Sequence, residues 1–273
     1  MLRVITTVVT LALAASVGAV ALIDTTPDAA PRPEVTVRAL AAQRWRPQPG
    51  ASFQIQYSGK LRATTAAVID LDGVETSKAT VTRLKRAGKR VICYFNAGAW
   101  ENWRADRGKC PASVRGKQKD GWPDERWLDV RKRSILMPIM TARMKVCKAK
   151  GFDAVDPDNL DGYQAKTGFR ITRKAELAYV KALSRVAHRL GMSIGLKNGL
   201  GMIRAAEPMV DFAVNEQCLQ YHECSAYRPF VRAKKAVFHI EYRGTITSIC
   251  AHAPAGFSSV RKHLRLDAWA RRC

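Results

Sequence analysis

The stretch Gly151-Phe-Asp-Ala-Val-Asp-Pro-Asp-Asn-Leu-Asp-Gly162 changes character halfway along its length. Phe152 and Val155 favour a buried strand, because bulky and β-branched side chains pack well on a pleated surface. Pro157 then ends the ladder of backbone hydrogen bonds. The carboxylates crowded at this strand end are Asp156, Asp158 and Asp161, with Asn159 between them. One or two could form a turn or cap a helix, but three neighbouring charges repel one another, so the stretch predicts a catalytic or ligand-binding site.

Similar apolar segments alternate with amphipathic helices through most of the chain. Besides the stretch above, the predicted strands cover residues 53–57, 66–72, 91–95, 193–197, 212–216, 236–242 and 256–260. The expected helix boundaries are Ser77, Gly88, Gly151, Thr172 and Gly191. Strand-helix alternation repeated about eight times predicts an α/β fold, a single-domain (β/α)8 TIM barrel. An open doubly wound sheet is the alternative, but no GxGxxG motif follows the first strand.

Polar side chains end nearly every predicted strand. They are Asp70, Asp72, Tyr94, Asn96, Asp156, Asp158, Lys197, Asn198, Asn215, Glu216, Glu241 and Tyr242. One polar strand end is an ordinary turn signal, whereas the carboxyl ends of all barrel strands meet on one face, where active sites lie. The sequence therefore predicts a polar pocket at that face.

A long loop is predicted between the third strand and the next helix, over residues 96–131. It carries tryptophans in otherwise polar surroundings, and aromatic faces stack on the apolar side of sugar rings. Trp100 and Glu101 are predicted to line the pocket. Trp122 and Trp127 are ranked below them. A loop folded over its own tryptophans is the alternative.

The N-terminus has the features of an export signal. Arg3 is the only charged residue before Asp24, and Ala19-Val20-Ala21 fits a cleavage pattern after an apolar stretch. The expected divisions of the chain are a signal peptide (1–21), a linker rich in Pro, Ala and Thr (22–44) and the folded barrel domain (45–273). An uncleaved membrane anchor is the alternative, because the stretch could just span a bilayer. Secretion, or anchoring by this segment, is therefore expected.

The formal net charge of the 273-residue chain is +23. Loss of the signal peptide would remove only Arg3, so the basic character belongs to the mature protein. Such an excess attracts polyanions, yet Lys and Arg are spread out rather than grouped in runs, which disfavours nucleic acid. An anionic cell-wall polymer is the expected charged partner, and a solubilising basic surface is the alternative.

Export makes the seven cysteines candidates for disulfides. The predicted pairs are Cys218–Cys224, Cys250–Cys273 and Cys110–Cys147. Cys93, inside a strand, is then expected to be a buried free thiol. Connectivity is not fixed by sequence. Because no CxxC pair is present and the five histidines are scattered, neither a metal nor another cofactor is expected.

Eight short motifs lie at the predicted strand ends and in the long loop. They are Val91-Ile-Cys-Tyr-Phe-Asn-Ala-Gly-Ala-Trp-Glu101, Gly121-Trp-Pro, Arg126-Trp-Leu-Asp129, Pro157-Asp-Asn-Leu-Asp-Gly-Tyr163, Gly195-Leu-Lys-Asn198, Asn215-Glu-Gln-Cys218, Glu223-Cys224 and Ile240-Glu-Tyr242. Together they resemble glycoside hydrolase family 114, whose members are endo-α-1,4-polygalactosaminidases. The resemblance covers residues 45–273. Asp156 and Gly199 depart from the family pattern, in which Glu and Asp are expected.

The resemblance implies a TIM-like barrel that cleaves polymers of α-1,4-linked galactosamine and N-acetylgalactosamine in exopolysaccharide. Asp158 is similar to the family's nucleophile, and Glu216 is similar to its acid/base. Asn159 would help hold Asp158 ionised, and Glu216 follows an apolar strand, as suits a general acid. A retaining mechanism is expected, for which the two carboxyl groups would lie about 5–5.5 Å apart, whereas about 6.5–9.5 Å would mean inversion.

An amine-bearing substrate would account for the remaining carboxylates. The expected amine partners are Asp70, Asp72, Glu101, Asp156, Asp161 and Glu241. Other expected substrate contacts are Tyr94, Trp100, Asn159, Lys197, Asn198, Asn215 and Tyr242. The pocket should then be acidic although the protein as a whole is basic. Lys197 could instead hold a carboxylate in place.

Two other functions remain open from the sequence. A non-catalytic barrel could bind polysaccharide, although the presence of both Asp158 and Glu216 argues against it. A secreted basic protein could also bind anionic polymer by charge alone, and such binding would weaken steeply with salt and ignore sugars. In either case, as for the enzyme, a monomer is expected.

Overall fold

A computed structural model describes residues 44–273 of the chain. The predicted signal peptide and the predicted linker as far as residue 43 lie outside the described residues. Across residues 44–273, no helix is both long enough and apolar enough to cross a membrane.

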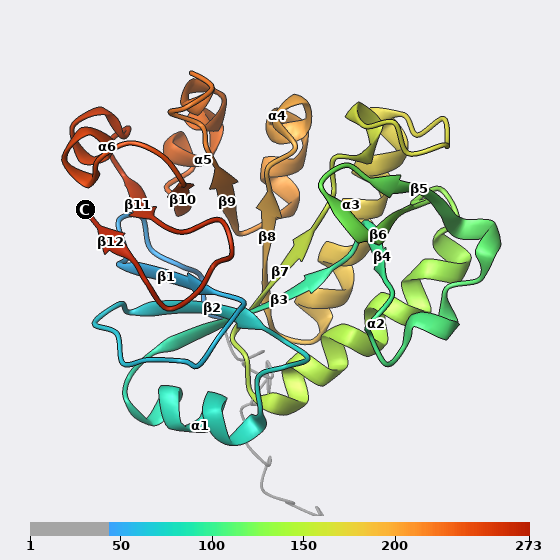
Figure 1. The fold of residues 1–273 in the computed structure, drawn as a ribbon, viewed down its shortest axis with the longest axis horizontal. Helices are drawn as coiled ribbons and strands as arrows, with labels where there is room; N and C mark the ends of the chain where they lie inside the picture. The colour runs from blue at the N-terminus through green and yellow to red at the C-terminus, as the bar shows by residue number, and fades with distance from the viewer. Residues whose placement is uncertain (1–43) are drawn as a thin grey trace, which may run out of the picture. The chain divides into compact units, whose positions relative to one another are not determined.

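Within the described residues, eight parallel strands and one short antiparallel strand form a sheet in which consecutive strands pair with one another (Figure 1). The strands of this sheet are β1 (Phe53–Gln56), β2 (Val68–Asp72), β3 (Arg90–Asn96), β7 (Ala154–Asp158), β8 (Ser193–Lys197), β9 (Phe212–Glu216), β10 (Val237–Glu241), β11 (Phe257–Arg261) and β12 (Arg271–Arg272). After β1, the N–H of Tyr57 donates to the carbonyl of Leu266 at 2.9 Å. This contact brings the last segment back to the first strand and nearly closes the barrel, so the predicted barrel fold is confirmed.

The strands alternate between an inner and an outer face, as the period of two requires. Side chains of the inner face include Phe53, Ile92, Phe212 and Phe238, and the rings of Phe53 and Phe238 stack with centroids 4.3 Å apart. The outer face packs against helices in a second apolar cluster. Near the carboxyl ends the inner positions become polar, so they deliver side chains to the barrel mouth.

Helices cover the outer face of the sheet. They are α1 (Lys78–Arg86), α2 (Arg133–Lys150), α3 (Arg173–Arg189), α4 (Ile203–Ala206), α5 (Arg228–Arg232) and α6 (Ile246–His252). Ser77 and Thr172 cap α1 and α3 as predicted, since their hydroxyls accept hydrogen bonds from Thr80 N–H and Ala175 N–H. Gly151 ends α2 with a left-handed φ of 97°, which glycine adopts without steric cost. Residues 57–67, between β1 and β2, form no helix, so the alternation is incomplete there.

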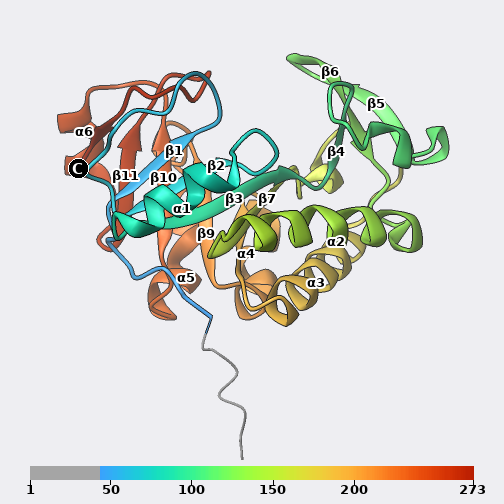
Figure 2. The same ribbon diagram turned by 90° about the horizontal axis from the view of Figure 1, so that it is seen from below.

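The segment predicted as one long loop contains a second sheet. Its strands are β4 (Ala99–Glu101), β5 (Arg115–Lys119) and β6 (Trp122–Leu128), and they pair antiparallel in the order β4-β6-β5. Figure 2 shows this small sheet beside the barrel, on the side of α2. The prediction of a loop is wrong because β5 is polar throughout and its register with β6 shifts twice, which removes the alternation that identifies a strand.

Three disulfides join the described cysteines. Cys218–Cys224 and Cys250–Cys273 are as predicted. The third is Cys93–Cys147, with Cα atoms 6.0 Å apart, and Cys110 is the buried free thiol. The predicted Cys110–Cys147 pair is therefore wrong. Cys93 lies on the outer face of β3, where α2 packs and presents Cys147, and the position of α2 over β3 could not be known before the fold.

Candidate active site

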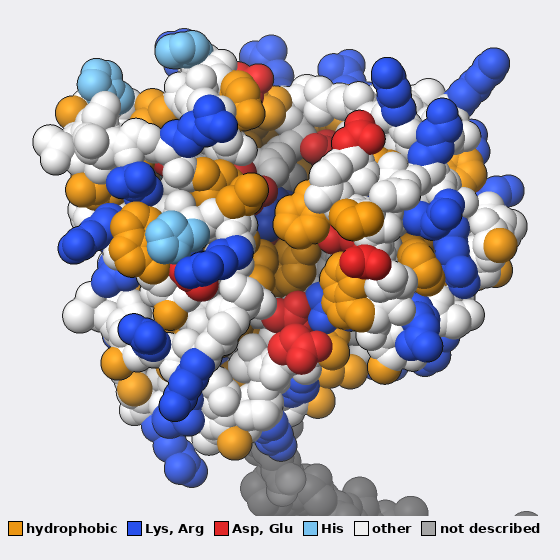
Figure 3. Space-filling model, in the orientation of Figure 1, with side chains coloured by type: hydrophobic (Ala, Val, Ile, Leu, Met, Phe, Trp, Pro, Cys, Tyr) orange, Lys and Arg blue, Asp and Glu red, His pale blue; other side chains and the backbone are white. Residues whose placement is uncertain are grey.

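A cleft of about 570 Å³ opens at the carboxyl ends of the barrel strands. Figure 3 shows it as a hollow with acidic side chains along it, while Lys and Arg cover the surrounding surface. Ten of the predicted site residues line the cleft. They are Asp72, Tyr94, Glu101, Asp158, Asn159, Asp161, Lys197, Asn198, Glu216 and Tyr242. The structure therefore brings these ten residues together in one cleft, at the face where the polar strand ends meet.

Asp158 is held at the end of β7 by several donors. The Tyr94 hydroxyl donates to its Oδ2 at 3.0 Å, and the backbone N–H of Asn159 donates to its Oδ1 at 2.8 Å. Burial would raise the pKa of the Asp158 carboxyl, but the charges of Lys197 and Lys119 and these hydrogen bonds outweigh it and hold the pKa below its usual range. Asp158 is therefore an oriented, ionised carboxylate at neutral pH.

Glu216 occupies the same level at the end of β9. Asn198 at the end of β8 donates from Nδ2 to Glu216 Oε2 at 3.0 Å, and its Oδ1 accepts the Glu216 N–H at 2.9 Å. The Tyr242 hydroxyl donates to Glu216 Oε1. Burial and the neighbouring Glu216 raise the pKa of Tyr242, so this hydroxyl remains a donor. These contacts fix the carboxyl group of Glu216 while leaving the residue only partly buried.

Lys197 acts as a buried cation beneath these carboxylates. Its Nζ lies 3.9 Å from Asp158 Oδ2 and 3.7 Å from Asp156 Oδ2, and the side chain is 2% exposed. Burial lowers the pKa of Lys197, but the surrounding carboxylates, led by Asp158, raise it overall, so the ammonium stays charged. Of the two roles that the sequence left open, the structure favours holding a carboxylate in place.

Asp70 and Asp156 lie below the cleft and do not line it. Both are fully buried. Tyr57 donates to Asp156 Oδ2 at 3.1 Å, and burial raises the pKa of Asp156 to about 6 although Lys197 opposes it. Among the described residues neither oxygen of Asp70 has a hydrogen-bond partner, and burial together with Asp156 raises its pKa well above the usual range. The expectation that these two meet substrate amines directly is wrong, because the inner face of the barrel is already filled at their level.

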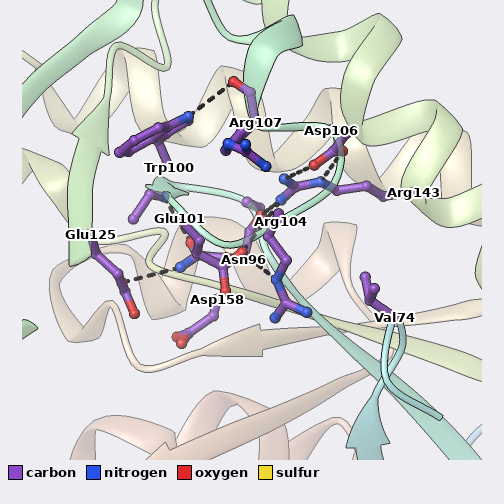
Figure 4. A network of polar contacts seen from close by, with 12 residues as sticks. Val74, Asn96, Trp100, Glu101, Arg104, Asp106, Arg107, Glu125, Arg143 and Asp158 are labelled. Atoms are coloured by element: carbon purple, nitrogen blue, oxygen red, sulfur yellow. Dashed lines mark hydrogen bonds and ion pairs between the residues drawn. The ribbon is translucent and has the colours of Figure 1, made fainter.

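Asp72 and Glu101 reach the rim of the cleft but are occupied by one arginine. Arg104 Nη2 contacts Asp72 Oδ2 at 2.6 Å and its Nε contacts Glu101 Oε2 at 2.9 Å. Figure 4 shows Arg104 next to Arg143, which forms its own pair with Asp106 at 2.8 Å. Because Arg104 pairs with both carboxylates, each already has a cationic partner in the structure.

Three predicted contacts are placed outside the cleft. The indole N–H of Trp100 donates to the carbonyl of Arg107 at 3.0 Å. Asn215 donates to Tyr227, and Glu241 accepts the N–H of Leu219 at 2.8 Å. Asn215 and Glu241 occupy outward positions of their strands, one residue away from the inward ones, and a shift of one residue reverses the face. The prediction of these three as cleft residues is corrected accordingly.

Aromatic and charged residues that the sequence did not predict as site residues complete the cleft. Trp103 and Trp122 are 49% and 50% exposed there, so the ranking of Trp100 above Trp122 is reversed. Lys119 lies 3.3 Å from Glu125 on the small sheet and donates to Asn159. Tyr57 could have been found, since it ends the first strand as Tyr94 ends the third. Lys119 and Glu125 had no signal, because the small sheet that carries them was not predicted.

Asp161 differs from the other carboxylates of the cleft. No residue in the described part of the chain donates a hydrogen bond to its side chain or forms an ion pair with it, and it is partly exposed. Burial and the charge of Asp158 raise the pKa of Asp161 to about 6. It is therefore an ionised carboxylate at neutral pH that is available to a cationic ligand.

The charges lining the cleft are predominantly negative. Seven carboxylates of the described residues face it: Asp72, Glu75, Glu101, Glu125, Asp158, Asp161 and Glu216. Four cations face it: Arg104, Lys119, Lys197 and Arg265. The expectation of an acidic pocket in a basic protein therefore holds for this structure.

Comparison with known proteins also indicates a glycoside hydrolase. The family model described as glycoside-hydrolase family GH114 matches residues 34–273. The crystal structure of Aspergillus fumigatus Ega3 in complex with galactosamine is 38% identical, covers 84% of this chain and 98% of that one, and superposes with a TM-score of 0.80. The glycoside hydrolase domain of PelA from Pseudomonas aeruginosa shares the fold at 14% identity, with 81% and 98% coverage and a TM-score of 0.67. No protein with a curated description matches.

Proposed function

This chain belongs to glycoside hydrolase family GH114 and is a glycosidase, and on that premise we propose that it cleaves exopolysaccharides containing α-1,4-linked galactosamine and N-acetylgalactosamine. The observation that carries the proposal is the acidic cleft, with Asp161 as a carboxylate that has no partner among the described residues. A protonated amine would pair with it, because opposite charges attract strongly in a partly dehydrated site. The bound galactosamine of the 38% identical Aspergillus fumigatus protein supports the same class of sugar.

The reaction is proposed to proceed by two displacements. The Asp158 carboxylate attacks the anomeric carbon, the glycosidic C–O bond breaks, and Glu216 gives its proton to the leaving oxygen. Glu216 then takes a proton from water, which attacks the same carbon and releases Asp158. The donors around Asp158 keep it ionised for the first step, and the partial exposure of Glu216 gives water access for the second.

Side chains on the barrel rim suit the rest of a polymer. The exposed faces of Trp103 and Trp122, which line the cleft, suit stacking on sugar rings of the polymer. Lys197 would stabilise the charge of the Asp158 carboxylate before it attacks and again as it is released, because the Lys197 ammonium lies 3.9 Å from Asp158 Oδ2. The three disulfides suit an exported enzyme, and we include secretion in the proposal.

Digestion of a partially deacetylated galactosamine polymer tests this function. The protein is expected to release short oligosaccharides whose cut sites, found by mass spectrometry, are adjacent to galactosamine. Glu216→Gln serves as the matched control for contaminating activity. Binding of the polymer with no cleavage by the wild-type protein would contradict the proposal.

A further inference from the structure

A second hollow lies at the amino ends of the strands, at the end of the barrel away from the cleft. Its volume is about 630 Å³. Arg90 begins β3 and Asp153 directly precedes β7, which fixes its position. The cations that line it are Arg44, Arg46, Lys85, Arg90 and Lys148. We call it the basic hollow, and none of these five residues lines the cleft.

The acidic residues near the basic hollow neutralise only part of this charge. Asp153 pairs with Lys85 at 2.9 Å and with Arg90 at 3.0 Å. Asp211 pairs with Arg44 at 2.9 Å and with Arg46 at 3.2 Å. Both carboxylates also accept backbone N–H groups at strand starts, so they are needed by the fold. In the described part of the chain, the five cations therefore have two carboxylate partners, of which only Asp153 lines the hollow, and a positive excess is directed into one concave space.

The donors of the basic hollow are open to a ligand. The side chains of Arg46, Arg90 and Lys85 are 59%, 49% and 38% exposed. Lys148 is exposed, and within the described residues its ammonium forms neither a hydrogen bond nor an ion pair. Guanidinium groups present paired N–H donors that match the oxygens of a phosphate. The chemistry of the hollow is therefore that of a phosphate-binding site.

We propose that the basic hollow binds a linear phosphodiester polyanion without flat bases, such as poly(glycerol phosphate), and attaches the enzyme to it. A polymer suits the hollow better than a single phosphate, because each exposed ion pair is weak and several are needed. Nucleic acid suits it less well. The aromatic ring of the hollow, Trp45, is partly buried and has the guanidinium of Arg90 5.7 Å from its centre, so it offers no open platform for stacking bases.

The attachment is independent of the glycosidase reaction, since it uses the opposite end of the barrel. The cleft would remain open to a soluble or neighbouring polysaccharide while the basic hollow holds the anionic polymer. This arrangement also gives the large positive charge a use that does not oppose binding of an amine-bearing substrate.

Calorimetric titration with a poly(glycerol phosphate) oligomer tests the site. Three forms of the protein are compared: wild type, Arg46→Ala/Lys148→Ala, and Arg83→Ala/Arg86→Ala. The second pair removes the same two charges from exposed positions of α1 outside the basic hollow. The hollow variant should weaken binding at least about tenfold, and the control less than about twofold, because only the first loses direct contacts to phosphate. The unfolding temperature of each variant checks that it is folded.

Other results would overturn the proposal. Equal weakening by both pairs of substitutions would mean that binding depends on net charge and has no site. Displacement of the oligomer by inorganic phosphate at an equal phosphate concentration would mean a site for a free phosphate. Equally tight binding of a single-stranded DNA oligomer of the same charge, lost in the hollow variant, would mean that the ligand is nucleic acid.

Discussion

The two ends of the barrel carry opposite charge. Among residues 44–273, seven carboxylates face four cations at the carboxyl ends of the strands, whereas at the amino ends five cations line a hollow with a single carboxylate, Asp153. The difference shows that a net charge of +23 says little about a particular site. A polyamine that the whole surface would repel still meets a negative cleft, because nearby charges dominate where solvent screens distant ones.

The largest effect is expected from the two carboxylates at the centre of the cleft. Asp158→Asn and Glu216→Gln should each lower kcat by about 10²–10⁴-fold or more, since each removes a group that forms or protonates a bond. Binding at the basic hollow should not change. Asp120→Asn, at an exposed position outside the cleft, is the matched control. Near-wild-type turnover in either carboxylate variant would contradict the assigned roles.

Reduction of the disulfides should lower cleavage at the cleft and binding at the basic hollow together, because it destabilises the whole barrel. A substitution within one site should affect that site alone. Loss of Cys93–Cys147, which ties α2 to β3, should cost about 2–5 kcal/mol of unfolding free energy. The bridge between Cys218 and Cys224 closes a much shorter loop and should cost less. Chemical denaturation of variants that lack one bridge or the other measures both losses of unfolding free energy. Thiol titration should find one free cysteine, Cys110, and only after unfolding. Several free thiols in the native protein would contradict the structure.

Asp161→Asn should have an intermediate effect that depends on the substrate. A charged hydrogen bond is worth about 1.5–3 kcal/mol, so KM for a deacetylated oligosaccharide should rise about tenfold or more. KM for the fully N-acetylated oligosaccharide, the internal control, should change little. Equal changes for both substrates would mean that Asp161 does not recognise the amine.

The pH dependence of KM sharpens the same assignment. Because burial and Asp158 raise the pKa of Asp161 to about 6, its carboxylate is ionised above that pH and protonated below it. KM for the deacetylated oligosaccharide should therefore rise as the pH falls through about 6. The N-acetylated substrate, and the Asp161→Asn variant, should lack this rise. The same rise in the variant would assign it to another group.

Salt should have little effect on hydrolysis in the cleft and a large effect on binding of the anionic polymer at the basic hollow. Binding of phosphodiester polymer should weaken steeply between low and physiological salt, as expected for contacts between exposed charges. Hydrolysis of a soluble oligosaccharide should change less than about twofold over the same range, because the cleft is partly shielded from solvent. Both quantities are measured on the wild-type enzyme at each salt concentration. Equal salt sensitivity of hydrolysis and polymer binding would contradict separate roles for the two ends of the barrel.

Sequence reasoning predicted most of the barrel and much of the cleft. Strands such as β8 and β9 were located because their buried residues form short apolar runs between turn signals. Asp158, Glu216, Lys197 and Asn198 were found because polar strand ends meet on one face. The remaining contacts could not be predicted, because they depend on the register of the strands or on how separate elements pack. Asn215 and Glu241 look like their inward neighbours in sequence, and only the pairing of strands turns them outward.

Other parts of the site depend on how separate elements pack. The small sheet of β4, β5 and β6 brings Lys119 and Glu125 over Asp158, although its polar strands carry no clear period. The ion pairs of Asp72 and Glu101 depend on Arg104, which lies in the turn after β4. The pairing of Cys93 with Cys147 depends on where α2 lies on the barrel. None of these contacts has a signature in the local sequence.

Trapping the covalent intermediate tests the central assignment most directly. Glu216→Gln is mixed with an α-galactosaminyl fluoride, whose leaving group needs no proton, so the first displacement can proceed while the second is slow. Intact-mass measurement should show one added sugar, peptide fragmentation should place it on Asp158, and azide should release it with retained configuration. An adduct on Asp156, or no adduct together with an inverted product, would contradict Asp158 as the nucleophile and retention as the outcome.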